Sequence, residues 1–303
     1  MRINDRKLVY IIVVIFLFNL NVVLTYKFID SLNSMYKKNS KIQLNFQTKL
    51  NISSNEDTNN YNSKITSIEN INNNHIIAQK KTVYLTFDDG PSINNTKKII
   101  KILNENNIKA TFFVTGNSVV RYPQIITELH KNKMAIAPHS YSHDYKLIYN
   151  NSKSYIDDLE KCIQEIEKVT KEKTIPFTRI PGGIKNKRIS PQILNEIKQE
   201  LKNRHIYYVE WNICSDDSIR EKMSSIDIKN NVMSQSKRLG KNKVLIVLMH
   251  DSYYKQATVE ALPSIIKFYK NSGWEFKTLN NISSEELREI IKLNLINTEY
   301  REK

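Results

Sequence analysis

Short apolar runs alternate with stretches of helical period from residue 81 onward. The runs are rich in β-branched and aromatic residues, which predicts strands, whereas apolar residues spaced three and four apart predict amphipathic helices. Strands are predicted at 82–87, 110–114, 134–137, 177–180, 206–213, 244–249 and 274–278. Helices are predicted at 96–106, 123–131, 155–170, 191–203, 228–239, 259–269 and 283–295. Such alternation is typical of a parallel α/β architecture, either a barrel or a doubly wound sheet.

The first 26 residues follow a different pattern. Residues 8–26 carry no charge and are mostly apolar, and a membrane-spanning helix needs about 20 such residues. A cleaved signal peptide is the alternative, but the residues after this stretch offer no small-x-small cleavage site. Arg2, Arg6 and Lys7 precede the stretch and favour a cytoplasmic position for residues 1–7. We therefore expect an uncleaved, single-pass anchor in the cell membrane, with the rest of the chain outside.

The segment that follows the anchor is polar and rich in asparagine. Residues 51–75 contain nine Asn, and a segment with so few large apolar residues cannot offset the entropy of ordering. We expect an extracellular tether at 27–79, a folded domain at 80–282, and a C-terminal helix with a polar tail at 283–303.

Composition excludes some classes of protein. Two cysteines exclude a disulfide framework and the Cys-rich zinc modules, and whether Cys162 and Cys214 pair stays open. Neither common Gly-rich phosphate-binding motif occurs. The 46 Lys and Arg against 31 Asp and Glu give a net charge of +15. That charge suits an anionic partner such as nucleic acid, a membrane surface or a wall polymer, and a solvated Lys-rich surface explains it equally well.

Polar residues gather where the predicted strands end. In parallel α/β folds the active residues collect at the carboxyl ends of the strands. The residues found there are Asp88 and Asp89, His139 and His143, Arg179, Asp216 and Asp217, and His250 and Asp251. Two imidazoles four residues apart, with one carboxylate, can hold a metal and leave a position open, which is the pattern of a catalytic zinc site.

Four segments in order resemble the motifs of a known family. They are Thr86–Pro91 (TFDDGP), His139–His143 (HSYSH), Arg179–Gly183 (RIPGG) and Leu248–Asp251 (LMHD). Over about residues 80–280 the chain resembles the polysaccharide deacetylases, the NodB-homology or carbohydrate esterase family 4 group. Pro138, directly before the second motif, departs from the usual pattern. The resemblance implies a distorted (β/α) barrel of about seven strands and a divalent metal, usually zinc. It also implies a hydrolase that removes acetyl groups from N-acetylated sugars.

The family's metal and base roles are carried over to matching positions. Asp89, His139 and His143 would hold the metal. Asp88 would act as the general base toward the attacking water, and Arg179 would pair with Asp88 and orient it.

The remaining roles concern the oxyanion and the leaving group. The backbone N–H of Gly182 would face the developing oxyanion, because a glycine allows close approach of the chain. His250 would protonate the leaving amine, which is too basic to depart as an anion. Asp217 best matches the carboxylate that orients His250, and Asp216 competes with it, since 210–218 follows the family's motif only loosely.

The function that we expect is a membrane-tethered N-acetylglucosamine deacetylase acting on a cell-wall polysaccharide, most simply peptidoglycan. Other acetylated substrates stay open, namely muramic acid, poly-N-acetylglucosamine and xylan. From other classes, a catalytically inactive carbohydrate-binding protein on the same fold is one alternative. A nucleic-acid binder is another, but it rests on charge alone and explains no motif, so no nucleic acid is expected. The oligomeric state is left open.

Overall fold

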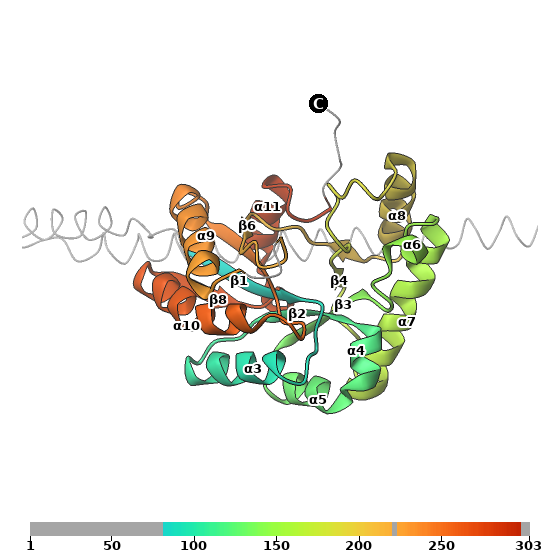
Figure 1. Cartoon of the computed structure of the whole chain (residues 1–303). Coiled ribbons are helices and arrows are strands. Elements are labelled where there is room, and N and C mark those ends of the chain that lie inside the picture. The colour runs from blue at the N-terminus through green and yellow to red at the C-terminus, as the bar shows by residue number, and fades with distance from the viewer. Residues whose placement is uncertain (1–80, 220–222, 298–303) are drawn as a thin grey trace, which may run out of the picture. The chain divides into compact units, whose positions relative to one another are not determined.

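The computed structural model of the chain describes residues 81–219 and 223–297 (Figure 1). The expected cytoplasmic end (1–7), anchor (8–26) and tether (27–79) lie outside these residues and stay predictions. Among the helices that the structure does describe, none has both the length and the apolar character that crossing a bilayer demands.

Parallel strands form the centre of the domain. The hydrogen-bonded order is β3 (Ala135–Ser140), β2 (Thr111–Thr115), β1 (Lys81–Asp88), β7 (Val244–His250) and β6 (Ile213–Cys214). A further strand, β8 (Trp274–Lys277), pairs with the first half of β1. Each of these pairs is parallel, which confirms the predicted α/β class.

The pairing of the adjacent strands β1 and β7 fixes the positions of Asp88 and His250 relative to each other. The strands pair from Thr82 opposite Val244 to Asp88 opposite His250. All seven residues of β7 are buried, and so is β1 after its first residue, as expected for parallel strands covered on both faces. Asp88 and His250 therefore lie level with each other at the carboxyl ends of adjacent strands.

The single strand predicted at 206–213 is wrong, because its two ends have different partners. The structure has β5 (Tyr207–Tyr208) paired with β4 (Phe177–Thr178), whereas β6 pairs with β7. The residues between β5 and β6 pass from one sheet to the other, and Val209 makes an isolated bridge to Ile296. The described residues thus form one six-stranded and one two-stranded parallel sheet, which is consistent with the distorted barrel that the resemblance implies.

Side chains connect β4 to β3 across the interruption between the two sheets. Thr178 Oγ1 donates to the carbonyl oxygen of Pro138 at 2.9 Å. One residue further, the Arg179 carbonyl oxygen lies 2.7 Å from His139 Nδ1. Pro181 and two glycines follow, and such residues do not extend a strand. The β4 strand is therefore short, and its end is held against the end of β3.

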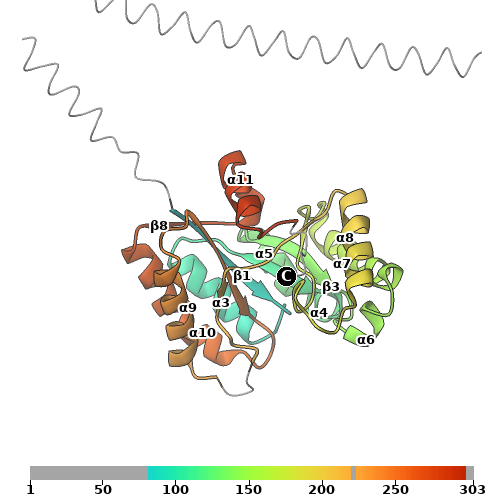
Figure 2. The same ribbon diagram turned by 90° about the horizontal axis from the view of Figure 1, so that it is seen from above.

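Helices surround the strands (Figures 1 and 2). Those of nine residues or more, among the described residues, are α3 (Asn95–Glu105), α5 (Pro123–Lys131), α7 (Ser152–Thr170), α8 (Pro191–Asn203), α9 (Ser225–Arg238), α10 (Gln256–Asn271) and α11 (Ser284–Lys292). Each overlaps a helix predicted from periodicity. The shorter α4 (Gly116–Arg121), α6 (Tyr145–Ile148) and η1 (Leu279–Asn281) were not predicted, because so few residues hold no periodic pattern.

The last helix belongs to the folded domain. In α11, Ile290 is fully buried in the same cluster as Ile296. Glu286 accepts a hydrogen bond from the Thr82 hydroxyl at 2.7 Å, so it ties α11 to the start of β1. It also closes a capping box with Ser283. The segment after 282 is thus packed on the domain as far as the described residues reach.

Candidate active site

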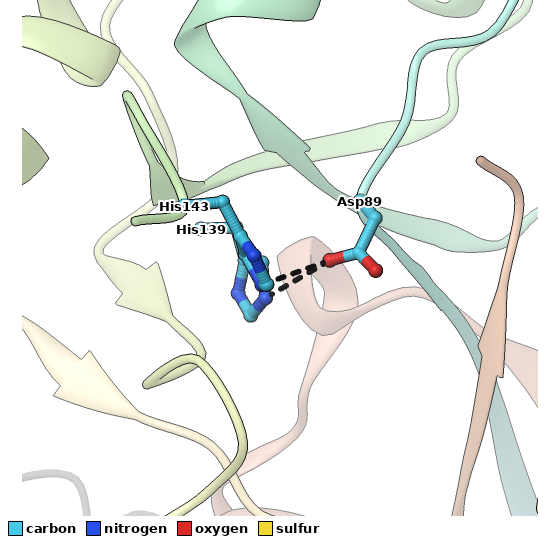
Figure 3. A group of neighbouring side chains, drawn as sticks. All are labelled: Asp89, His139 and His143. Carbon is cyan, nitrogen blue, oxygen red and sulfur yellow. Dashed lines mark ion pairs between the residues drawn. The ribbon is translucent and has the colours of Figure 1, made fainter. Parts of the chain in front are cut away.

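Asp89, His139 and His143 come together at the carboxyl ends of β1 and β3 (Figure 3). Asp89 Oδ1 lies 3.4 Å from His139 Nε2 and 3.2 Å from His143 Nε2. The three ligand atoms all lie within 4.8 Å of one another. Asp89 Oδ1 is buried, and none of the described residues donates a well-aligned hydrogen bond to it. An oxygen without a donor that faces two ring nitrogens is the arrangement that a cation would complete.

The tautomer of His139 supports this interpretation. Its Nδ1 lies 2.7 Å from a backbone carbonyl oxygen, that of Arg179. A carbonyl can only accept, so Nδ1 carries the hydrogen and the lone pair is on Nε2, toward Asp89. Burial is the main cause that lowers the pKa of His143, and this favours the neutral imidazole that a metal requires. The site therefore fits a divalent metal.

Backbone geometry turns these side chains inward. Asp89 and His143 have φ values of 74° and 53°, in the left-handed region, so the chain turns sharply at each. Between β2 and β3, Pro138 pairs with Val114 and Ser140 pairs with Thr115, which leaves His139 as the extra residue of a bulge. Proline cannot donate to a ladder, and a bulge re-aims the side chain that it contains. The unusual proline thus stands where the strand bends to present His139.

Asp158 of α7 holds the loop that carries both histidines. It is buried, and it accepts hydrogen bonds from the Ser140 hydroxyl at 2.5 Å and the Tyr141 and Ser142 N–H groups at 2.6 and 3.0 Å. The Ser140 oxygen in turn accepts from the His143 N–H at 2.9 Å. No sequence motif predicts this role for Asp158. The available signal was a carboxylate on the buried stripe of a predicted helix.

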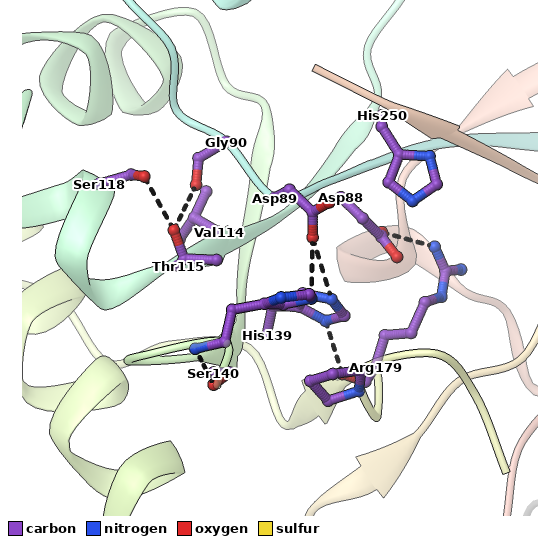
Figure 4. Close-up of polar contacts among 12 residues, drawn as sticks. Asp88, Asp89, Gly90, Val114, Thr115, Ser118, His139, Ser140, Arg179 and His250 are labelled. Atoms are coloured by element: carbon purple, nitrogen blue, oxygen red, sulfur yellow. Dashed lines mark hydrogen bonds and ion pairs between the residues drawn. The ribbon is translucent and has the colours of Figure 1, made fainter. Parts of the chain in front are cut away.

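Asp88 points away from the metal trio toward Arg179 (Figure 4). One guanidinium nitrogen donates to Asp88 Oδ1 and to the Thr86 hydroxyl, both at 2.8 Å. The Arg179 Nε donates to the Val209 carbonyl at 3.1 Å, and the guanidinium lies over the Phe113 ring at 4.3 Å. Asp88 and Arg179 are both buried. The predicted pairing is present, and the arginine is fixed from several sides.

Asp217, and not its neighbour Asp216, contacts His250. Asp217 Oδ1 lies 2.6 Å from His250 Nδ1, and its Oδ2 accepts from the His250 N–H at 2.8 Å and the Thr258 hydroxyl at 2.7 Å. Burial alone would lower the pKa of His250, but the hydrogen bond and charge of Asp217 outweigh it and raise the pKa to about 9. His250 is therefore protonated at neutral pH. Thr258 lies on α10, and no sequence motif predicts its contact with Asp217.

The predicted oxyanion residue lies close to the site. Gly182 has a φ of 77°, and a Cβ there would come within 2.6 Å of Asn186 Nδ2 and 3.2 Å of the Tyr145 hydroxyl. The Tyr145 ring meets His143 edge-on, with 5.3 Å between the ring centroids. Position 182 thus requires a glycine, because its φ is in the left-handed region and its neighbours leave no room for a Cβ. The role of its N–H stays a prediction.

Asp251 follows His250 but faces a different set of groups. Its carboxyl is fully buried beside Gly90 and accepts from the Thr96 hydroxyl at 2.6 Å. Burial is the main cause that raises its pKa to about 7.

The two cysteines, Cys162 and Cys214, are both free thiols. Neither they nor Asp251 belongs to the metal trio.

The geometry combines three functions on one face of the domain. A trio that fits a metal lies next to a paired carboxylate that can accept a proton and near a protonated imidazole that can donate one (Figure 4). Such a set can activate water, stabilise an oxyanion and protonate a leaving group. Hydrolysis of an amide or ester is the chemistry that these groups serve together.

Comparison with known proteins agrees with this chemistry. A family model described as polysaccharide deacetylase matches residues 75–200. A peptidoglycan-N-acetylglucosamine deacetylase of Bacillus cereus is 31% identical over 206 residues, which are 66% of this chain and 67% of that protein. A peptidoglycan-N-acetylmuramic acid deacetylase of Bacillus subtilis is 26% identical over 212 residues, 69% of this chain and 74% of that protein.

A solved structure shows the same arrangement of the chain. The catalytic domain of a peptidoglycan N-acetylglucosamine deacetylase from Eubacterium rectale matches with a TM-score of 0.61 and 33% identity. The match covers 67% of this chain and 90% of that domain. Together these likenesses confirm the resemblance that the four motifs predicted.

Proposed function

Because this chain belongs to the polysaccharide deacetylase family, we propose that it is a metal-dependent hydrolase that removes N-acetyl groups from the N-acetylglucosamine residues of peptidoglycan. One observation carries the proposal: a metal-fitting trio shares one face of the domain with a carboxylate paired with Arg179 and an imidazole paired with Asp217. The similar proteins of Bacillus cereus and Eubacterium rectale bear that substrate in their names.

The metal would be held by Asp89, His139 and His143. Two imidazoles and one carboxylate form a ligand set common in catalytic zinc sites, so Zn²⁺ is the ion that we propose. The chemistry supplied by the bound ion is Lewis acidity toward the acetyl carbonyl and the attacking water.

The proton transfers belong to the protein. Asp88 would accept a proton from the water as its oxygen bonds to the acetyl carbon, with Arg179 holding the carboxylate in position. The Gly182 N–H would donate to the oxyanion that develops. His250 would then give its proton to the sugar nitrogen as the carbon–nitrogen bond breaks, and Asp217 stabilises the charged imidazole beforehand. The products are acetate and a free amine on the sugar.

We propose that the domain works outside the cell, tethered to the membrane by residues 8–26. An uncharged 19-residue stretch preceded by Arg2, Arg6 and Lys7 supports the anchor, and an Asn-rich segment before residue 80 supports a tether toward the wall. Membrane fractionation and N-terminal sequencing of the mature protein test it. A secreted protein that begins near residue 27 would refute the anchor.

The function is tested by acetate release from defined polymers. Full-length protein, stripped with a chelator and reloaded with Zn²⁺, is incubated with purified peptidoglycan, chitin oligomers and acetylated xylan. We expect free acetate and an equal amount of new amine from the N-acetylglucosamine polymers, only with metal present. Acetate release that resisted chelation would contradict the metal role, and release from xylan alone would contradict the substrate.

A variant of the trio provides the matched comparison. His143→Ala should lose both bound zinc and activity, because three protein ligands leave no redundancy. His130→Ala serves as the control, since His130 lies on α5, outside the metal trio, with its Nε2 3.7 Å from a carboxylate oxygen of Glu172. Full zinc content in His143→Ala would mean that the ligand assignment is wrong. An inactive carbohydrate-binding protein, the alternative, would release no acetate with any metal.

A further inference from the structure

A pocket of about 480 Å³ opens on the Asp89 side of the metal trio. Three segments build it: the turn after β1, the end of α4 and the loop after β7. Its lining residues are Asp89, Pro91, Ser92, Ser118, Arg121, Tyr122, Ser252, Tyr253 and Tyr254. In Figure 4, Ser118 lies on the other side of Asp89 from Arg179. A ligand in this pocket would therefore lie next to the reacting group without touching the Asp88–Arg179 pair.

Two tyrosines stand exposed at the pocket. Tyr253 and Tyr254 are 56% and 86% exposed, and their rings meet edge-to-face with 5.2 Å between centroids. Their loop is fixed to the start of α3, because the Asn94 and Asn95 side chains donate hydrogen bonds to the Tyr253 carbonyl at 2.9 and 3.0 Å. Adjacent exposed aromatic residues on a fixed loop mark a recognition surface. Tyrosine rings can pack on the C–H faces of a sugar while their hydroxyls bond to its oxygens.

Arg121 adds a positive charge to the same pocket. It is the last residue of α4, is exposed, and forms no ion pair with a carboxylate among the described residues. Arg179 and Arg204, by contrast, each pair with acidic side chains. A guanidinium free to make a bidentate contact selects a carboxylate. The pocket thus combines a surface for a sugar ring with a site for an acid.

We propose that this pocket binds a carboxylate-bearing sugar next to the residue that is deacetylated, with Arg121 on the carboxylate and the two tyrosines on the ring. The proposal rests on the function proposed above. In peptidoglycan each N-acetylglucosamine neighbours a muramic acid residue, which carries an acid on its lactyl group or on the attached peptide. The pocket would make the enzyme prefer peptidoglycan over neutral chitin.

The test compares substrates on the full-length, zinc-loaded protein. The probes are chitotetraose, a peptidoglycan tetrasaccharide with free lactyl carboxylates, and the same tetrasaccharide with peptide stems. For each probe, kcat/KM is measured from acetate release. The preference ratio is kcat/KM for a peptidoglycan tetrasaccharide divided by kcat/KM for chitotetraose. Arg121→Gln should lower this ratio by about tenfold, the size expected from one charge-assisted hydrogen bond. The loss should occur mostly in KM and shrink at high salt.

Arg238→Gln is the matched control, since Arg238 is an exposed arginine in the last turn of α9, outside the pocket residues. It should leave the ratio unchanged. If Arg121→Gln lowers the ratio only for the substrate with free lactyl groups, the lactyl carboxylate binds at Arg121. If it lowers the ratio only for the substrate with peptide stems, a peptide carboxylate binds there. An unchanged ratio in Arg121→Gln, with wild-type activity on all probes, would overturn the pocket assignment and leave the deacetylase function standing. Wild-type protein inactive on every probe would refute both.

Discussion

Two buried carboxylates of the site, Asp88 and Asp217, are each paired with a basic side chain of a different kind. Asp88 lies 2.8 Å from Arg179 and Asp217 lies 2.6 Å from His250. Arginine never releases its proton at physiological pH, whereas histidine titrates in that range. In the first pair, a permanently charged arginine therefore faces the carboxylate that we propose as proton acceptor. In the second pair, the Asp217 carboxylate raises the pKa of the His250 imidazole to about 9, which keeps the proton on the residue that we propose as proton donor.

The surroundings of the two pairs reinforce the difference. Arg179 also donates to Thr86 and Val209, so its position does not depend on Asp88 alone. His250 receives its orientation from Asp217 through both its ring and its backbone N–H. Replacing Asp88 should thus leave Arg179 in its place but with a buried, unpaired charge, whereas replacing Asp217 should change the protonation of His250.

The largest effect is expected from Asp88→Asn. An amide cannot accept the proton of water, so turnover should fall by about 10² to 10⁴. Bound zinc should remain, because Asp88 is not part of the trio. Zinc content and acetate release are measured on the same sample.

Asp89→Asn is the comparison for that variant. A neutral amide is a poorer ligand than a carboxylate, so here zinc itself should be lost. Equal zinc loss in the two variants would mean that our division of roles between neighbouring residues is mistaken.

The next effect concerns pH. Asp217→Asn removes the carboxylate charge that opposes the effect of burial most strongly, so the pKa of His250 should fall well below about 9, with Asp89 and Asp88 as the remaining charges that raise it. A general acid must be protonated, so the alkaline limb of the kcat profile should move to lower pH. At pH 8 the loss should be about tenfold or more. An alkaline limb unchanged from wild type would contradict the acid role of His250.

The same pair contributes to stability with a definite sign. Since the pKa of His250 is raised in the folded state, its contribution is complete below about 6.5 and is lost as pH rises through about 9. Asp217→Asn should abolish this part of the pH dependence of unfolding.

Sequence alone predicted most elements of the fold and the residues of the motifs. Long amphipathic helices such as α7 and α8 were predicted because their apolar stripes are regular. The interruption at 209–212 between β5 and β6 was not predicted. Pairing of β5 with β4 and of β6 with β7 depends on tertiary contacts, which the local sequence pattern does not contain. Short helices such as α4 were not predicted, because six residues are too few to show a helical spacing of apolar residues.

The site shows the same limit. Motif residues were identified because their types and order carry the chemistry. Asp158 and Thr258 were missed because their importance lies in what they contact, the histidine loop and Asp217. The choice between Asp216 and Asp217 also needed the fold, since both follow the same strand.

A smaller effect, on stability rather than chemistry, is expected at Asp158. Asp158→Ala removes an acceptor of three hydrogen bonds from the loop between His139 and His143. The free energy of unfolding should fall by about 2–4 kcal/mol, measured by urea denaturation, and zinc should bind more weakly. Asp157→Ala is the control, because Asp157 is exposed on the same helix and pairs only with Lys153. Similar losses in both variants would show that Asp158 does not specifically support the loop.

The smallest effect is expected one residue before the orienting carboxylate. Asp216 has a φ of 59°, a conformation that asparagine also tolerates. Its N–H donates to Cys214 Sγ at 3.4 Å, its carbonyl oxygen accepts from the Ile219 N–H at 3.1 Å, and its carboxylate interacts with the Cys214 thiol. Asp216→Asn should therefore keep kcat within about twofold and leave the alkaline limb in place. Its neighbour Asp217→Asn removes the same charge in the same turn, so general electrostatics cannot explain a difference between them. A shifted limb in Asp216→Asn would transfer the orienting role to Asp216, because only the carboxylate that holds His250 protonated can set where that limb falls.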